Sequence, residues 1–174
     1  MVIKEIILAP TRLGLAGYGL QHGKVARLWL PGQNEKTLTQ AMAAWAGYGK
    51  PAVQKTPLAE RITAYFAGEA VDFPEQVDLA GLTEFQTVIL TTLRRKIKRG
   101  QTTTYRELAE LAGKPGAARA VGSVMAANPV PLIIPCHRVL RGDGGVGGFS
   151  GPGGEKLKKL MLELETSGKP PRIK

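Results

Sequence analysis

The chain has 174 residues, a formal net charge of +10, 43% hydrophobic residues and one cysteine. At this length folding buries roughly 70% of the extended-chain surface, so a core can form without disulfides or metal ions. A single cysteine excludes disulfides within the chain and any zinc site that needs two thiolates, and no apolar run approaches the ~20 residues of a membrane span. We therefore expect a basic, globular, intracellular protein that binds no metal and no membrane.

The excess positive charge lies in the second half of the chain. Residues 1–80 carry eight basic and seven acidic side chains, whereas residues 81–174 carry sixteen and seven. Such asymmetry favours an anionic partner on the C-terminal half, and a polyphosphate backbone is the commonest one. A merely well-solvated basic surface is the alternative.

The first 80 residues predict a small unit of strands and helices. Short β-branched runs at 2–8 and 25–30 predict strands separated by a glycine-rich turn region, and a two-strand or three-strand meander fits this pattern. Apolar side chains at helical spacing predict amphipathic helices over 35–46 and 57–67. The segment 71–81 has no period, which makes it the best candidate for a linker and puts the domain boundary near residue 80.

Beyond the linker, two helices joined by a tight turn are predicted after a first helix over 85–97. Thr104 and Glu107 form a capping-box pattern that starts one of them, and the other covers 117–127, where almost every side chain is small except Arg119. Such a pair is a helix-turn-helix candidate, with an ordinary pair of packed helices as the alternative. Arg119 favours the first, because a lone long cation on a helix of small residues can approach a duplex closely.

The residues that carry chemistry surround the cysteine. Cys136 ends an apolar, strand-like run and is followed directly by His137, Arg138 and a glycine-rich loop over 142–154. A lone intracellular cysteine is more often an inert buried thiol. A histidine and nearby cations are, however, the usual means of lowering a thiol pKa, which favours a nucleophile.

A histidine that acts as a base also needs a carboxylate to orient it. The apolar spacing of residues 155–165 predicts a helix that offers three candidates. The pattern alone does not choose among Glu155, Glu163 and Glu165.

The chain resembles the O6-alkylguanine-DNA alkyltransferases, a family that repairs DNA by a suicide alkyl transfer. The resemblance is dense over residues 84–165, and it is carried by Pro135-Cys136-His137-Arg138-Val139, by the preceding residues 128–134, by Val146-Gly147 and Phe149-Ser150-Gly151, and by Phe85-Gln86 with residues 100–105. It implies an α+β fold in which a small N-terminal α/β domain, ribonuclease H-like, spans 1–80. A mainly helical C-terminal domain with a winged-helix-like helix-turn-helix spans 81–174 and carries the DNA-binding and alkyltransferase functions.

The resemblance also implies a mechanism. Cys136 is expected to attack the alkyl carbon on O6 of guanine, and more weakly on O4 of thymine, which inactivates the protein irreversibly as a methylated-DNA–protein-cysteine S-methyltransferase. His137 takes the thiol proton through a water, and Glu163, which lies 27 residues after Cys136 as in the family, orients it, with Glu165 as the alternative. Asn128 resembles the hinge of the active-site segment, and Tyr105 the phenol that supplies a proton to the leaving guanine.

The expected partner is double-stranded DNA containing O6-alkylguanine, bound through its minor groove without sequence preference and with the damaged nucleotide flipped out. Arg119 is implied to fill the space of the extruded nucleotide. The other DNA contacts implied are Thr104, Tyr105, Arg106, Ala117, Ala118, Ala120, Gly122, Ser123 and Arg138, and the base contacts are Met125, Cys136, Val139, Phe149 and Ser150. No cofactor is needed, and we expect a monomer in the cytoplasm at the nucleoid, or in the nucleus if the source is eukaryotic.

Two other functions remain as alternatives. A related protein that recognises alkylguanine without repairing it lacks the acceptor cysteine, so Cys136 argues against that function. A cysteine hydrolase would use Cys136, His137 and a carboxylate, but it would not account for the helix-turn-helix or the basic half.

Overall fold

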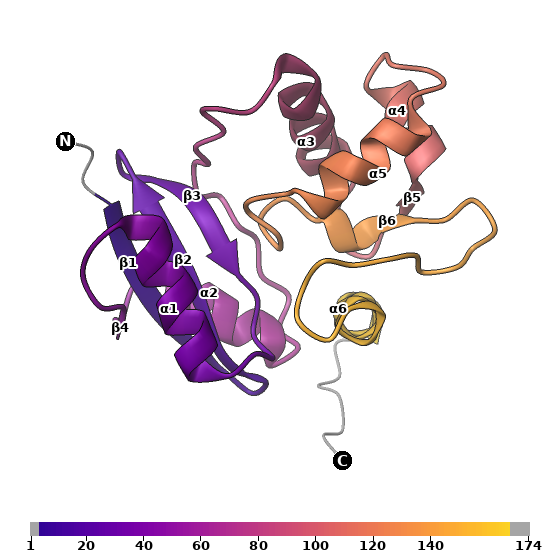
Figure 1. Ribbon diagram of the computed structural model, residues 1–174. Helices are drawn as coiled ribbons and strands as arrows, with labels where there is room; N and C mark the ends of the chain where they lie inside the picture. Colours follow the sequence, from indigo (N-terminus) through magenta and orange to yellow (C-terminus); the bar gives the residue numbers. More distant parts are fainter. Residues whose placement is uncertain (1–3, 168–174) are drawn as a thin grey trace.

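The computed structural model describes residues 4–167, which form a sheet-based unit and a helical unit lying side by side (Figure 1). Strands β1 (Lys4–Thr11), β2 (Gly14–Gln21) and β3 (Lys24–Trp29) form an antiparallel meander, and the short β4 (Ala52–Val53) pairs with β1 in parallel. The strand order is β3-β2-β1-β4. This mixture of a sheet and helices confirms the α+β class.

Strand β2 lies in the glycine-rich region, and it makes the meander three-stranded rather than two-stranded. Its glycines lie under α1 (Glu35–Ala46), which packs very close to the strand. A Cβ atom at Gly17 would lie 2.4 Å from Met42 Sδ, and one at Gly19 would lie 2.3 Å from the Trp45 ring. Glycine is therefore required here to let the helix approach, rather than to turn the chain.

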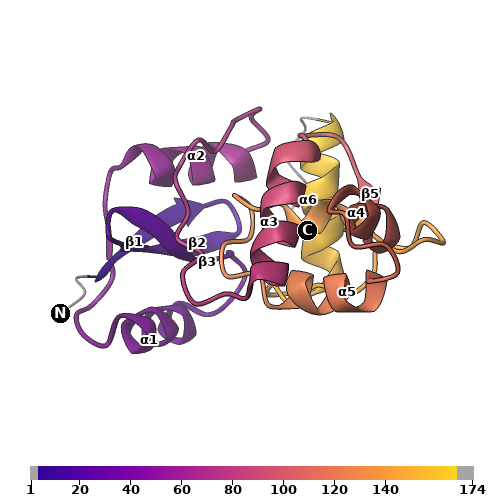
Figure 2. The ribbon, with the colours of Figure 1, turned by 90° about the horizontal axis from the view of Figure 1, so that it is seen from above.

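Both faces of the sheet are covered by helices. Ile6 and Leu8 of β1 pack against α1, whereas Ile7 and Ala9 point to the opposite face and the cluster that contains α2 (Pro57–Phe66). Side chains alternate between faces along a strand, so a continuous apolar run is what a strand buried on both sides requires. Figure 2 shows α1 and α2 on opposite sides of the sheet.

The second half is mainly helical. Its elements are α3 (Glu84–Lys96), β5 (Thr103–Thr104), α4 (Tyr105–Leu111), α5 (Ala118–Ala126), β6 (Val139–Leu140) and α6 (Glu155–Ser167). The capping box at the start of α4 is confirmed: Thr104 Oγ1 accepts from the Glu107 amide at 3.2 Å, and Glu107 Oε2 accepts from the Thr104 amide at 2.8 Å. Leu90, Leu108 and Val121 hold α3, α4 and α5 around one apolar cluster.

The segment before the cysteine is not a strand, although its apolar run is strand-like. Leu132 has a φ of 75°, and the chain forms only an isolated bridge between Pro131 and Ile134 before a 3-10 turn at Cys136–Arg138. The Leu28 amide of β3 donates to the Pro129 carbonyl at 2.9 Å, which ties this segment to the sheet.

One hydrophobic cluster joins the two halves. It contains residues of the sheet and α2 together with Val130, Leu132 and Ile133 of the active-site segment and Leu157 of α6. The two halves therefore share a core, and a domain boundary near residue 80 stays a prediction.

Candidate active site

Cys136 begins a buried 3-10 turn, and its side chain is almost inaccessible, with 4% of the residue exposed. Asn128 shapes the loop that leads to it: its Nδ2 donates to the Ile134 carbonyl at 2.9 Å, and its Oδ1 accepts from the Val130 amide at 3.0 Å. These two bonds close the chain between the end of α5 and the cysteine. Asn128 thus lies where the hinge is expected.

His137 is fully buried and is held by a carboxylate of α6. Its Nε2 lies 2.6 Å from Oε1 of Glu165. The same carboxylate accepts from the Tyr65 hydroxyl at 2.9 Å and from two nitrogens of Arg138 at 2.9 and 3.0 Å. Burial by itself would raise the pKa of Glu165, but the hydrogen bonds from His137 and Arg138 outweigh it and hold that pKa well below its usual range. The carboxylate therefore stays ionised.

The charge of Glu165 decides which nitrogen of His137 carries a proton. Burial lowers the pKa of His137, although Glu165 opposes this effect, so the imidazole is neutral at pH 7. A carboxylate only accepts hydrogen bonds, which assigns the proton to Nε2 and leaves Nδ1 with a free lone pair. Nδ1 is buried and has no hydrogen-bond partner among residues 4–167. It is thus free to act as a base.

The assignment of Glu163 as the orienting carboxylate is corrected to Glu165. The buried face of α6 carries Leu157, Met161 and Leu164 together with Glu165, whose side chain is 1% exposed, whereas Glu163 faces solvent. Residues two positions apart lie on opposite sides of a helix. Glu163 was predicted from its distance of 27 residues from Cys136 along the sequence. An irregular loop lies between the two residues, so this distance does not determine which side of α6 is buried.

The predicted contact of Arg138 with DNA stays a prediction, and the contacts of this side chain lie inside the protein. Its side chain is 13% exposed, pairs with Glu165 and donates from Nη1 to the Ile97 carbonyl at 2.8 Å. A buried carboxylate needs a paired cation, and Arg138 supplies it. The arginine therefore has its polar partners inside the protein.

A buried cation that the sequence analysis missed lies on the other side of the cysteine. Lys158 of α6 is 1% exposed; its Nζ donates to the Val139 carbonyl at 2.7 Å and lies 5.9 Å from the centre of the Tyr105 ring. The sequence does indicate that Lys158 is buried, because it precedes Met161 by three residues and so falls on the apolar face of a predicted helix.

Opposing effects act on the pKa of the Cys136 thiol. Burial raises the pKa of Cys136, while a hydrogen bond from the Asn128 side chain and the charge of Lys158 lower it. The net direction is upward, so the free protein holds a protonated thiol at neutral pH. A base is therefore needed at the moment of reaction.

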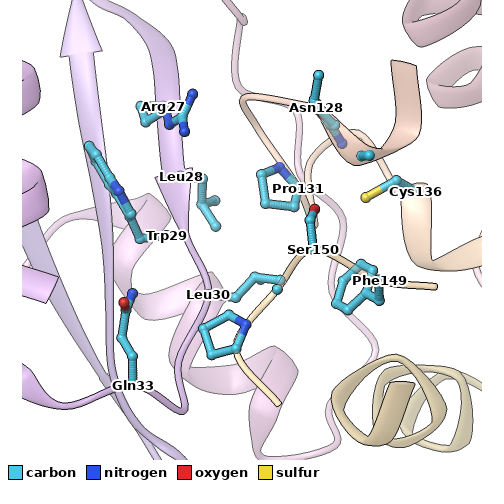
Figure 3. A pocket seen from close by; sticks show the side chains of 14 residues that line it. Arg27, Leu28, Trp29, Leu30, Gln33, Asn128, Pro131, Cys136, Phe149 and Ser150 are labelled. Atoms are coloured by element: carbon cyan, nitrogen blue, oxygen red, sulfur yellow. The ribbon is translucent and has the colours of Figure 1, made fainter. Parts of the chain in front are cut away.

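Two cavities meet at Cys136, and Figure 3 shows the residues that line the second of them. We call the first the helix-side cavity; its volume is about 330 Å³ and it is lined by Tyr105, Gly122, Met125, Ala126, Cys136, Gly148, Phe149, Ser150 and Lys158. We call the second the sheet-side cleft; its volume is about 460 Å³ and it is lined by Arg27, Leu28, Trp29, Leu30, Gln33, Ala126, Ala127, Asn128, Pro131, Cys136, Phe149, Ser150, Gly151 and Pro152. Four of the five residues expected at the base line the helix-side cavity. Val139 does not, and its carbonyl is occupied by Lys158.

Next to the helix-side cavity, α5 presents a row of small exposed side chains. Arg119, Ala120 and Ser123 are exposed, Ala117, Ala118 and Gly122 are half-buried, and Val121 and Met125 point inward. A groove of about 520 Å³ runs beside them and is lined by Thr104, Tyr105, Arg106, Ala118, Arg119, Gly122, Arg141, Gly142 and Asp143. The guanidinium of Arg119 has no hydrogen bond or ion pair within the described part of the chain. The expected DNA contacts other than Arg138 thus lie on or beside one surface.

Neither a membrane span nor a metal cluster is found within residues 4–167. None of the helices there is long and apolar enough to cross a membrane. No three His, Cys, Asp or Glu side chains of that range lie close enough together to hold a metal ion.

Comparison with known proteins places these features in a family. Residues 84–167 match the family model described as 6-O-methylguanine DNA methyltransferase, DNA binding domain. The chain is 40% identical over 129 residues to a methylated-DNA–protein-cysteine methyltransferase of Methanothermobacter thermautotrophicus, covering 74% of this chain and 70% of that one. It is 43% identical over 111 residues to the Mycobacterium bovis protein of the same name, spanning 64% of this chain and 65% of that protein's length.

Solved structures are similar to this chain over more than nine-tenths of its length. The crystal structure of Mycobacterium tuberculosis OGT in complex with DNA has a TM-score of 0.76 and 33% identity to this chain, and the match covers 95% of both chains. The O6-methylguanine-DNA methyltransferase of Pyrococcus kodakaraensis has a TM-score of 0.70 and 28% identity, over 92% of this chain and 98% of that one.

The fold and site define a two-part α+β protein with one buried cysteine beside an exposed helix of small residues. The chain belongs to the family of methylated-DNA–protein-cysteine methyltransferases.

Proposed function

We propose that this protein repairs alkylated DNA by transferring the alkyl group of O6-alkylguanine to Sγ of Cys136, once per molecule. The observation that carries the proposal is the pairing of a buried thiol with a neutral His137 in the same turn. The histidine is locked by an ionised Glu165 with Nδ1 unprotonated. This is the arrangement that activates a cysteine nucleophile.

The chemistry is a displacement that balances without a cofactor. Nδ1 of His137 takes the thiol proton through a bridging water, and Glu165 stabilises the imidazolium that results. Sγ then forms a bond to the alkyl carbon as the bond from that carbon to O6 breaks. Guanine leaves with a proton supplied by Tyr105, whose hydroxyl is replenished from the imidazolium, so one proton moves overall from thiol to guanine.

DNA is proposed to approach the row of small residues on α5. A related protein of Mycobacterium tuberculosis is described in complex with DNA. For the present protein, we propose that the partner is duplex DNA, bound through the minor groove without sequence preference. The alkylated guanine is extruded into the helix-side cavity, and Arg119 fills the space that it leaves in the base stack. Extrusion costs a few kcal/mol, and a damaged pair lowers this cost. We propose that one protein molecule acts alone, inside the cell where its DNA lies.

The test is to weigh the intact protein after incubation with a duplex that contains one O6-methylguanine. We expect the mass to rise by one CH₂ group on the peptide that contains Cys136, in proportion to the DNA added until the protein is consumed. The Cys136→Ala variant should gain no mass. Repeated turnover with unmodified protein would contradict the single-use mechanism.

A protein that only recognises the damage is the second candidate. It would bind the modified duplex more tightly than an unmodified one and gain no mass. Tight binding without mass gain in the wild-type protein would therefore favour recognition over repair.

A further inference from the structure

The sheet-side cleft is not used by the transfer of a methyl group. It shares Ala126, Cys136, Phe149 and Ser150 with the helix-side cavity, so the two spaces join at the sulfur. Figure 3 shows Cys136 at the helical side of the cleft, with its sulfur directed into it, and Arg27, Trp29 and Gln33 on the opposite, sheet side. The far wall therefore comes from β3 and the turn that follows it.

The geometry of displacement decides what this space receives. Sulfur, the reacting carbon and the leaving O6 lie on one line in the transition state, so the other groups on that carbon project sideways from the line. If guanine fills the helix-side cavity, a large substituent on the reacting carbon must extend into a different space that also reaches the sulfur. The sheet-side cleft is such a space.

The walls of the cleft have two characters. Near the sulfur they are apolar, with Leu30, Pro131 and Phe149. At the sheet side, Arg27 is exposed with its guanidinium 6.0 Å from the centre of the Trp29 ring, and this guanidinium makes no hydrogen bond or ion pair with residues 4–167. Arg27 is also the one charged side chain among the described residues that line the cleft.

We propose that the sheet-side cleft is a subsite for bulky O6 substituents that have an apolar body and end in an anion, and that Arg27 selects the anionic end. This inference rests on the proposed transfer to Cys136 and names the substrate class that the same site prefers. The transferred group becomes a thioether of Cys136, while guanine leaves with the proton of the thiol, as for methyl. Arg27 touches only the distal end of the substituent and takes no part in bond breaking.

The experiment compares two free bases of equal size and opposite charge, O6-(4-carboxybenzyl)guanine and O6-(4-aminomethylbenzyl)guanine. The rate of mass gain on Cys136 is measured for each, and the ratio of the two rate constants is the readout. Because exposed ion pairs contribute about 0.2–1 kcal/mol, we expect the wild-type protein to prefer the carboxylate by about 1.4- to fivefold at low salt. Arg27→Gln should abolish this preference, and Arg27→Glu should reverse it.

The matched control is Lys24→Glu, which makes the same charge change in an exposed residue of β3 that does not line the cleft. It should leave the ratio unchanged. Methyl transfer from duplex DNA is measured on every variant as a baseline. If the wild-type protein transfers no methyl group, the proposed function fails.

If methyl transfer proceeds but Arg27→Glu leaves the ratio unaltered, the subsite proposal is overturned while the function stands. Slower methyl transfer from duplex by Arg27→Glu, with an unaltered ratio, would instead mean that Arg27 contacts the DNA backbone. That result would also overturn the proposal.

Discussion

Glu165 determines the protonation of the site more than any other residue. Its two oxygens accept hydrogen bonds from His137, Tyr65 and Arg138. These bonds replace the hydrogen bonds to water that the carboxylate loses on burial. Burial keeps His137 neutral, and the carboxylate holds its proton on Nε2, so that Nδ1 is available to the thiol. Tyr65 and Arg138 act through Glu165 and are positioning residues.

Glu165→Gln is expected to slow alkyl transfer by about 100-fold or more, because general base catalysis contributes at least that much and an amide no longer compels the proton onto Nε2. It should also lower the free energy of unfolding by about 3 kcal/mol, since Arg138 loses its partner. Single-turnover rates and urea unfolding measure the two effects. Glu163→Gln, on the exposed side of the same helix, is the control, and an equal loss in both variants would contradict the assignment.

At the level of elements, α4 and α5 are shaped for an external partner. The capping box sets the start of α4 beside Tyr105, and α5 keeps its large side chains inward while small ones face out. A helix without bulk on its outer face allows a duplex to come near, and Arg119 then reaches furthest. The loop between β6 and α6 completes both cavities through Phe149 and Ser150.

Arg119→Ala should slow transfer from a duplex by about tenfold or more and leave transfer from free O6-benzylguanine unchanged. Extruding a nucleotide from a duplex costs a few kcal/mol, and a residue that fills the gap in the base stack offsets part of this cost. A free base is not extruded, so its transfer does not depend on that residue. The two rate constants are measured on the same preparation. Lys114→Ala, at an exposed turn residue outside the groove, is the control, and equal slowing of both substrates by Arg119→Ala would exclude the role.

At the scale of the whole molecule, the site is completed across the two halves. Tyr65 comes from α2 of the sheet-based unit, yet its hydroxyl bonds to Glu165 in α6. Arg99, three residues beyond the end of α3, lies over the Tyr65 ring and donates to the Leu164 carbonyl at 2.9 Å. The shared hydrophobic cluster and these polar contacts bury His137 completely.

Complete burial of a neutral histidine makes stability depend on pH. The folded-state pKa of His137 is lowered by burial, so the unfolded chain binds the proton more readily, and stability falls as the pH drops below about 6.5 towards the folded pKa. Glu165, with its lowered pKa, adds a further loss below about pH 4.3. We expect His137→Asn to flatten the fall in urea midpoint between pH 7 and pH 5. His22→Asn, at a side chain that is 63% exposed, should not flatten it.

Much of the fold was predictable because local rules decide it. The spacing of apolar residues gave α1, α2, α3 and α6 close to their observed ends, and the cap at Thr104 gave the start of α4. The failures lie where a distant element overrides local propensity. Gly17 and Gly19 form a strand because α1 packs on them, and the apolar run before Cys136 is bent because Asn128 closes it into a loop.

The sequence by itself determined the class of fold, the reactive cysteine and its histidine, and the surface of small residues with Arg119, since each depends on residue type at short spacing. Only the tertiary structure decided that Glu165 orients His137, that Arg138 points inward, that Lys158 and Tyr65 belong to the site, and that a second cleft reaches the sulfur. The physical reason is that burial and pairing of charges depend on which face of a helix meets the core. That choice is made by elements far apart in the chain.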